Sequence, residues 1–166
     1  MSFARAAALP ASDPTRAMMV ATVGEFSGVS TASTAHEKSF SIGHLAQLVA
    51  TMPGWLISIA KGENIDLAAG GRGYTYETTE NLLATFDKLV ADARAVMGAT
   101  SDEDYAKPWS LMMGEKVLIT TPRGDTVRNT INHLIHHRGQ LTVYLRLLDV
   151  PVPSTYGPTA DEGWGA

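Results

Sequence analysis

The chain has 166 residues, of which 45% are apolar, and it carries a formal net charge of −4. This length predicts a single domain with a buried core, and a weakly acidic chain without a long basic run argues against nucleic-acid binding. The absence of cysteine excludes disulfides, thiolate metal ligands and a cysteine nucleophile.

The distribution of apolar residues favours a cytoplasmic protein. The sequence has no unbroken apolar run of about 18 residues, so we expect no transmembrane helix and no membrane partner. The N-terminus, Met1-Ser2-Phe3-Ala4-Arg5, lacks the long apolar segment of a secretory signal.

Residues 1–35 form a poorly defined N-terminal segment, and residues 36–166 show a clear pattern. Gly24 and Gly28 interrupt any long helix in the first segment. A short amphipathic helix at about 14–27 is still allowed by the apolar residues there, which are Met18, Met19, Val20, Val23 and Phe26.

Two amphipathic helices are predicted in the middle of the chain. The first begins near Ser41, whose side chain or that of Ser39 can cap it, and continues to about residue 59. Pro53-Gly54 should kink or divide this helix. The glycine-rich residues 61–76 form a loop, and the second helix covers about 78–98 with Gly98 as its stop signal.

Residues 99–123 are expected to be mostly loop. Within them, Leu111-Met112-Met113 and Val117-Leu118-Ile119 are compatible with a small β-hairpin near 110–120. Pro122-Arg123-Gly124 is expected to turn, and Asp125 or Thr126 to cap a last helix at about 126–149. The proline-rich tail after Pro151 should be extended.

The last helix contains the most informative segment, Asn132-His133-Leu134-Ile135-His136-His137-Arg138-Gly139-Gln140. His133 and His137 are four residues apart and therefore lie on the same helical face, where they can provide two ligands to a metal. The alternative is a hydrogen-bonded or solvated structural pair. His136 lies about 100° around the helix and is expected to be exposed or to contact a partner. Without thiolates, the available donors favour Zn, Ni, Fe or Mn.

Long amphipathic helices joined by long crossover loops predict an all-α helical bundle. Such bundles build metal sites from facing helices near the core. His133 and His137 lie at one border of the apolar stripe of the last helix, whereas Arg138 lies at the opposite border and is expected away from the metal.

Over residues 36–162 the sequence resembles the DinB family of metal-binding four-helix bundles. The similarity covers His36-Glu37-Lys38-Ser39-Phe40-Ser41, Leu45-Ala46, Met52-Pro53-Gly54-Trp55 and Pro122-Arg123. It continues through Asn132-His133 to Leu141, Tyr144-Leu145-Arg146, Tyr156-Gly157-Pro158 and Ala160-Asp161-Glu162. The histidine-rich segment followed by Arg-Gly-Gln is its most specific part.

This resemblance implies a divalent metal held by three histidines, of which His133 and His137 are two. The family's third ligand usually follows the Leu-Ala step of the second helix, where this chain has Leu48. His44 lies one turn earlier on nearly the same face, about 6 Å along the axis, and is our candidate for the third ligand. It could equally be a structural histidine at the helix start. His36, or a carboxylate from another segment, remains a further alternative.

The resemblance also implies a function, for which the catalytic residues are unknown. Family members with an assigned activity include thiol-dependent transferases and isomerases, so we expect a thiol S-transferase or a hydrolase acting on a small-molecule substrate, such as a low-molecular-weight thiol. The alternative is a non-catalytic bundle with a degraded metal site that serves as a binding or structural dimer. We also expect a homodimer, because the helices have apolar side chains beyond what one small bundle needs, namely Trp55, Leu56, Tyr144 and Leu147. The alternative places these residues under the loops and the C-terminal tail.

Overall fold

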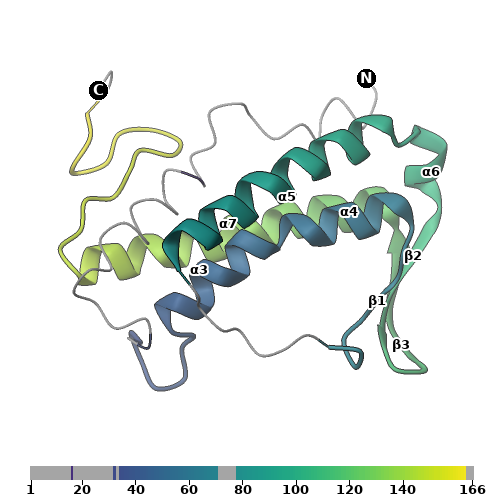
Figure 1. The fold of residues 1–166 in the computed structure, drawn as a ribbon, viewed down its shortest axis with the longest axis horizontal. Helices are drawn as coiled ribbons and strands as arrows, with labels where there is room; N and C mark the ends of the chain where they lie inside the picture. Colours follow the sequence, from purple (N-terminus) through teal and green to yellow (C-terminus); the bar gives the residue numbers. More distant parts are fainter. Residues whose placement is uncertain (1–15, 17–31, 33, 71–77, 164–166) are drawn as a thin grey trace. The chain divides into compact units, whose positions relative to one another are not determined.

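The elements follow one another in the order α3, α4, β1, α5, α6, β2, β3 and α7 (Figure 1). The computed structural model describes residues 16, 32, 34–70 and 78–163. Apart from Arg16, the helix expected at 14–27 lies outside these residues.

The chain divides into two compact units, and long helices contribute to both. Of the described residues, unit 1 contains 51–70 and 88–134. Unit 2 contains 34–50, 78–87 and 135–163, together with residues 16 and 32.

The helix predicted at 41–59 is divided where Pro53 interrupts it, as expected. α3 spans Ile42–Thr51 and α4 spans Pro53–Lys61. The hydroxyl of Ser41 accepts a hydrogen bond from the backbone N–H of His44 at 3.3 Å, which is the N-cap that the sequence suggested. α4 ends at Gly62, which has the left-handed φ of 81° that favours glycine at a helix C-terminus.

Residues 42–61 together are long and apolar enough to cross a membrane, judged by length and composition alone. This finding differs from the expectation of no such segment, which rested on the absence of a long unbroken apolar run. The most apolar window of this segment is 56% buried inside the protein. A core helix of a soluble protein has the same properties, so this segment is weak evidence for a membrane span.

The helix predicted at 78–98 is confirmed, whereas α7 begins earlier than predicted. α5 spans Thr79–Ala99 and α7 spans Arg123–Leu147. The turn expected at Pro122-Arg123-Gly124 is wrong, because Arg123 and Gly124 already belong to the first turn of α7. The backbone N–H of Arg123 donates to the carbonyl of Lys107 at 3.0 Å, which satisfies a helix-start donor without a side-chain cap.

A small three-stranded sheet adds to the helices. The expected hairpin is confirmed as β2, Pro108–Met113, antiparallel to β3, Lys116–Pro122. β1, Ile65–Asp66, pairs parallel with β2 and was not predicted. A carboxylate oxygen of Asp66 accepts hydrogen bonds from the N–H groups of Gly114 and Ala68, each at 2.8 Å. These bonds, led by the one from Gly114, lower the pKa of Asp66 and attach the hairpin turn to β1.

The short helix α6, Asp102–Ala106, lies in the segment expected to be loop. The hydroxyl of Ser101 accepts a hydrogen bond from the N–H of Asp104 at 3.1 Å. A serine followed by acidic residues is a helix-start signal, and it could have identified this turn.

The core of unit 1 lies between α4, α6, the sheet and the parts of α5 and α7 that belong to this unit. Trp109 is 3% exposed, and its indole N–H donates to the carbonyl of Glu63 at 2.7 Å. Aromatic and aliphatic side chains surround it in one buried cluster, formed by Leu56, Ile59, Ala60, Ala93, Met97, Tyr105, Trp109 and Val127.

In unit 2 the C-terminal tail is attached to α7 by charge. The guanidinium of Arg146 donates to both carboxylate oxygens of Asp161, at 3.1 and 2.6 Å. The same carboxylate accepts the backbone N–H of Val152 at 2.9 Å. Arg146 and this N–H together lower the pKa of Asp161, so the tail is held in place while Asp161 is ionised.

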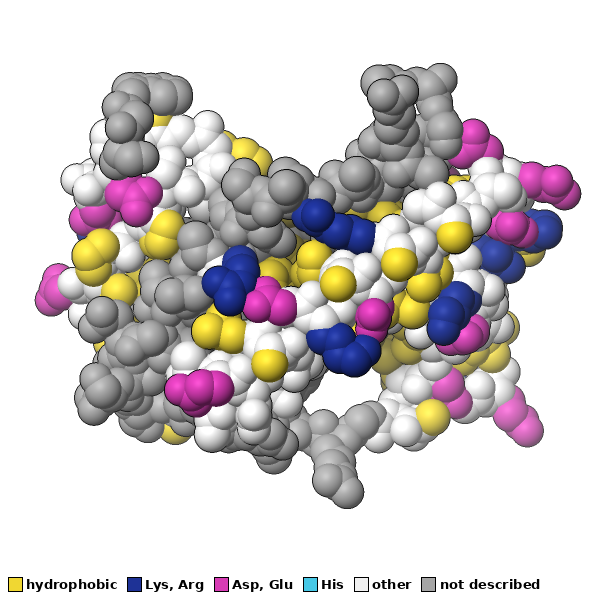
Figure 2. Space-filling view, turned by 45° about the horizontal axis from the view of Figure 1, so that its top comes forward, with side chains coloured by type: hydrophobic (Ala, Val, Ile, Leu, Met, Phe, Trp, Pro, Cys, Tyr) yellow, Lys and Arg dark blue, Asp and Glu magenta, His cyan; other side chains and the backbone are white. Residues whose placement is uncertain are grey.

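The surface has charges of both signs. On the face drawn in Figure 2, Lys and Arg side chains lie beside Asp and Glu side chains, and apolar side chains are exposed among them.

Gly62→Ala should destabilise the protein by about 1–2 kcal/mol, because alanine resists the left-handed φ. A Cβ at this position would also lie 2.1 Å from a terminal nitrogen of Arg123, so that side chain would have to move. Urea unfolding measures the effect. Gly98→Ala is the matched control, because a Cβ there meets nothing within 4 Å. Alanine in place of glycine should stabilise α5 by up to about 1 kcal/mol. Equal changes in the free energy of unfolding for the two variants would contradict this explanation.

Candidate functional site

The histidines of α7 differ in exposure although they are close in sequence. His137 is buried, with 6% of its surface exposed, whereas His133 and His136 are exposed. His136 therefore matches its expected exposure, and its ring contacts that of His137 edge to face with centroids 5.1 Å apart.

A hydrogen bond fixes the orientation of His137. Its Nδ1 lies 2.7 Å from the side-chain oxygen of Gln140, three residues later on the same helix. A carboxamide oxygen can only accept, so Nδ1 is the donor in this hydrogen bond and Nε2 is the ring nitrogen that remains for another contact. Metal-binding histidines commonly have such a partner on the second ring nitrogen. This arrangement makes Nε2 of His137 suited to bind a metal.

His44, in the first turn of α3, belongs to the same aromatic cluster. Phe40 stacks on its ring with centroids 4.2 Å apart and planes at 13°, and the Phe40 ring lies 6.2 Å from that of His137. Burial lowers the pKa of His44, and the nearby His137 lowers it further. The neutral imidazole, which is the form that binds metals, is therefore favoured.

The three predicted ligands do not gather into one ready-made site. Among residues 34–70 and 78–163, no group of three or more His, Asp or Glu side chains could hold a metal ion. His44 and His137 belong to one aromatic cluster in unit 2. His133 lies one turn before His137 on α7, about 6 Å along its axis, and Leu48 is half-buried one turn after His44 on α3.

The remaining histidine has a local structural role. His36 is exposed, and its Nδ1 accepts the backbone N–H of Lys38 at 3.1 Å. The backbone carbonyl of His36 accepts the N–H of Ser39 at 2.9 Å. Both bonds stabilise the turn before α3, so His36 helps to shape the approach to this helix.

Arg138 is only 6% exposed, and its guanidinium carbon lies 5.0 Å from the ring centroid of Tyr156 in the tail. This contact has the geometry of a cation–π interaction. Arg138 therefore contacts the C-terminal tail.

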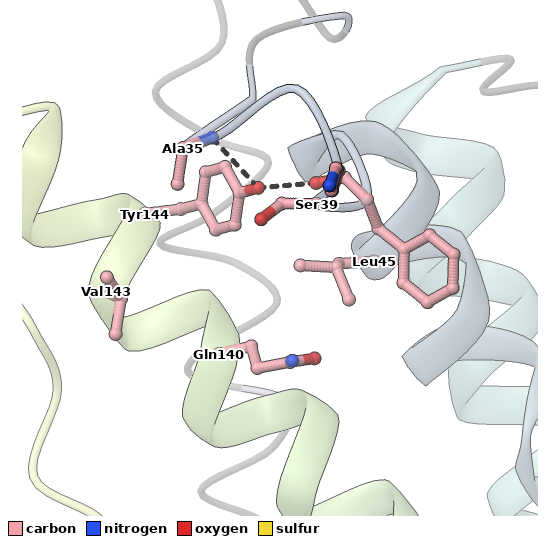
Figure 3. Close-up of a pocket in the computed structure, with 8 residues that line it drawn as sticks. Ala35, Ser39, Leu45, Gln140, Val143 and Tyr144 are labelled. Atoms are coloured by element: carbon pink, nitrogen blue, oxygen red, sulfur yellow. Dashed lines mark hydrogen bonds between the residues drawn. The ribbon is translucent and has the colours of Figure 1, made fainter.

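A pocket that the sequence did not reveal lies beside the aromatic cluster. It has a volume of about 340 Å³ and is lined by Ala35, Lys38, Ser39, Phe40, Leu45, Gln140, Val143 and Tyr144. In Figure 3, Gln140, Val143 and Tyr144 come from α7, and Ser39 and Leu45 come from the turn before α3 and from α3 itself. The pocket shares Phe40 and Gln140 with the surroundings of the two histidines.

Tyr144 holds the walls of this pocket together. Its hydroxyl donates to the carbonyl of Phe40 and accepts the N–H of Ala35 at 3.1 Å, and Figure 3 shows both bonds. These contacts join residues 104 and 109 positions apart, so no helical periodicity could predict them. The sequence signal for them was Tyr144 itself, because the hydroxyl of a tyrosine in the core needs a hydrogen-bond partner.

The family model of the DinB family matches residues 35–164. A 41-residue stretch is 44% identical to the uncharacterized protein YrdA of Bacillus subtilis (strain 168), and the match covers 25% of each chain. The fold is similar to crystal structures of two DinB-like proteins. The protein from Bacillus cereus ATCC 10987 has a TM-score of 0.66 at 19% identity, over 86% of this chain and 89% of that one. YjoA of Bacillus subtilis has a TM-score of 0.61 at 17% identity, over 86% and 92%.

The pKa of His44 should lie below 6.5 in metal-free protein, and NMR titration of the ring protons in the presence of a chelator measures it. The unfolded chain then binds this proton more tightly than the folded one. His44 protonation should therefore cost stability as the pH falls through 6.5 and below.

His137→Gln should raise the His44 midpoint toward 6.5 without reaching it, because burial is the larger cause. His136→Gln is the matched control and should leave the His44 midpoint unchanged. A wild-type midpoint at or above 6.5 would contradict the assigned environment.

Proposed function

The chain belongs to the DinB family, and from this premise we propose that it is a metal-dependent protein whose ligands are His133, His137 and His44. The observation that carries the proposal is the hydrogen bond between Nδ1 of His137 and the side-chain oxygen of Gln140. This bond orients a buried imidazole and assigns Nε2 as the nitrogen that would bind the metal. The lowered pKa of His44 favours the neutral imidazole at that position.

The donor types limit which metal this set would hold. Imidazole nitrogens suit Zn, Ni and Fe, and a set completed by oxygen donors also suits Mn. His133 and His137 are both on α7. A change in the side-chain conformation of the exposed His133 would bring its imidazole toward that of His137 along one face of the helix. His44 would approach from α3, which completes three protein donors and leaves an open position for substrate or water.

A divalent ion at this position would lower the pKa of a bound thiol or water molecule, so that a thiolate or hydroxide forms near neutral pH. The function that fits is a thiol S-transferase or a hydrolase acting on a small molecule, such as a low-molecular-weight thiol. The contributions of the protein itself are specific. Gln140 holds the His137 tautomer, Phe40 excludes water from one face of His44, and the neighbouring pocket provides space for a substrate.

The fold proposed for the whole chain is the four-helix bundle of the family, in which a helix at about 14–27 completes the helices described here. An ion pair of Arg16 supports its attachment to α5. The guanidinium of Arg16 donates to both carboxylate oxygens of Asp87, at 2.7 and 3.0 Å.

A second candidate function is a non-catalytic DinB-like bundle with a degraded metal site. The observation that favours it is Leu48, which occupies the position of the family's usual third ligand, together with the exposed side chain of His133. In this case, His133 and His137 would form hydrogen bonds within the protein or line a ligand pocket.

We also propose that the protein forms a homodimer. Of the four side chains on which the expectation rested, Leu56 and Tyr144 are buried within the chain and cannot form a contact surface. Leu147 is 62% exposed and Val143 is 54% exposed, one turn apart on α7. Leu147 is the exposed apolar side chain that suits a two-fold contact, whereas Val143 also lines the pocket described above.

Protein purified without a histidine tag should contain about one divalent metal ion per chain by elemental analysis, and chelation should lower its thermal stability. His137→Gln should abolish binding, and Gln140→Ala should weaken it by about 10–100-fold, because the ligand loses its orienting partner. His136→Gln, an exposed neighbour on the same turn, is the matched control and should bind normally. Absence of metal binding at micromolar concentrations would exclude the metal-dependent function.

Two further variants decide the third ligand. If His44 is a ligand, His44→Ala should weaken binding by about tenfold or more, and Leu48→His should tighten it by adding a donor. If His44 is structural, His44→Ala should leave the affinity unchanged while Leu48→His alone creates strong binding. The degraded-site alternative predicts that the double variant His133→Gln/His137→Gln keeps any ligand binding.

Light scattering at tens of micromolar should give about twice the mass of one chain. Leu147→Glu places a charge at this contact and should shift the protein to the monomer. Leu118→Glu, on an exposed strand position, is the matched control and should stay dimeric. A wild-type mass near that of one chain would rule out the dimer.

A further inference from the structure

The pocket beside the histidines has features that are independent of metal binding. None of its lining residues is a candidate metal ligand, and all of them belong to unit 2. Its volume of about 340 Å³ corresponds to about eleven liquid-water volumes, which is within the range of small-molecule sites. The pocket can therefore hold a small organic molecule.

One part of the pocket wall is apolar. Phe40, Leu45 and Val143 provide an aromatic ring and branched aliphatic groups, and the small side chain of Ala35 limits the pocket near Tyr144. Leu45 is 2% exposed, and Phe40 is 47% exposed, so this wall extends from the protein interior to solvent. An apolar ligand body would be removed from water against it.

The other part of the wall is polar and has one formal charge. Lys38, Ser39 and Gln140 provide an ammonium, a hydroxyl and a carboxamide. Within the described part of the chain, Lys38 forms none of the salt bridges, which join Arg16, Lys88, Lys107 and Arg146 to aspartates. The described residues that line the pocket include no Asp or Glu. A ligand with one negative charge would match this wall.

Gln140 links the polar wall to His137. Its side-chain oxygen accepts a hydrogen bond from Nδ1 of His137, so its –NH₂ group can donate to a ligand. Tyr144 plays a different part, since its hydroxyl already donates to Phe40 and accepts from Ala35. It shapes the pocket, whereas Lys38, Ser39 and Gln140 provide the donors.

We propose that this pocket binds a small organic monocarboxylate, with its carboxylate facing Lys38 and Ser39 and its apolar body against Phe40, Leu45 and Val143. A single lysine without any arginine suits a singly charged carboxylate better than a phosphate, which is usually held by more donors. The ligand would lie one side chain away from His137, with Gln140 between them.

Sodium phenylacetate is the test ligand, phenylacetamide is its neutral counterpart, and binding is measured by NMR titration of chelator-treated protein. Phenylacetate should bind with a Kd of about a millimolar or below. Phenylacetamide should bind about three- to fivefold more weakly, which is the effect of one solvent-exposed charge pair. The difference should shrink in about 1 M salt. Equal affinity for the two compounds, or no binding of phenylacetate, would overturn the proposal.

Two pairs of variants locate the site. Lys38→Gln should remove the preference for phenylacetate over phenylacetamide, whereas Lys116→Gln, an exposed lysine on the hairpin, should keep it. Val143→Phe should fill the pocket and abolish binding, whereas Leu147→Phe, one turn later on α7, should not. Both positions on α7 are exposed, so the variants should fold, and their thermal midpoints check this. Unchanged binding in Val143→Phe would overturn the proposed location.

Inorganic phosphate tests whether the charge alone is sufficient, and it should not compete with phenylacetate at about tenfold excess. Competition by phosphate at equal concentration would contradict the role of the apolar wall. Because the protein is metal-free in these measurements, failure of the carboxylate site and failure of the metal proposal can be distinguished.

Discussion

The hydroxyl of Tyr144 joins the C-terminal part of α7 to the turn before α3, and the arrangement of the candidate site depends on this contact. By bonding to the carbonyl of Phe40 and the N–H of Ala35, it satisfies two backbone groups that precede α3. Tyr144 itself is 6% exposed, so water competes weakly for these bonds. The contact holds Phe40 in place, and Phe40 in turn stacks on His44 and lies near His137.

The two sides of this contact have different chemical consequences. On the α3 side, burial keeps His44 neutral, which prepares an imidazole to donate a lone pair. On the α7 side, Gln140 sets the tautomer of His137 and also lines the pocket. One carboxamide therefore contacts both the proposed metal centre and the proposed carboxylate site, so a bound carboxylate and a bound metal would influence each other through Gln140.

Elements defined by local sequence pattern could be predicted, whereas those defined by distant contacts could not. The division at Pro53, the helix from residue 79 and the hairpin around Gly114 follow from proline chemistry, apolar periodicity and turn residues. The start of α7 at Arg123 was missed because its first donor bonds to Lys107 rather than to a local cap. The parallel pairing of β1 joins Ile65 to Leu111, which no local pattern specifies.

The candidate site shows the same limit. Helical spacing placed His133 and His137 on one face, but their different burial depends on what packs against each turn. His137 is buried and lies near the ring of Phe40, whereas His133 is exposed. Leu48 was recognised through the family pattern, whereas the role of Phe40 beside His44 required the three-dimensional structure. The pocket was missed for the same reason, since its two walls are about a hundred residues apart in sequence.

In this account, Gln140 orients His137 by accepting a hydrogen bond from Nδ1, so that Nε2 is the nitrogen that binds the metal. A two-bond ¹H–¹⁵N correlation spectrum of the imidazole rings tests it directly, because the two tautomers give different nitrogen shifts. In chelator-treated protein near neutral pH, we predict a protonated Nδ1 and a bare Nε2 for His137, and Zn²⁺ should then shift Nε2. A protonated Nε2, or Zn²⁺ addition that leaves the His137 signals unchanged, would contradict the account.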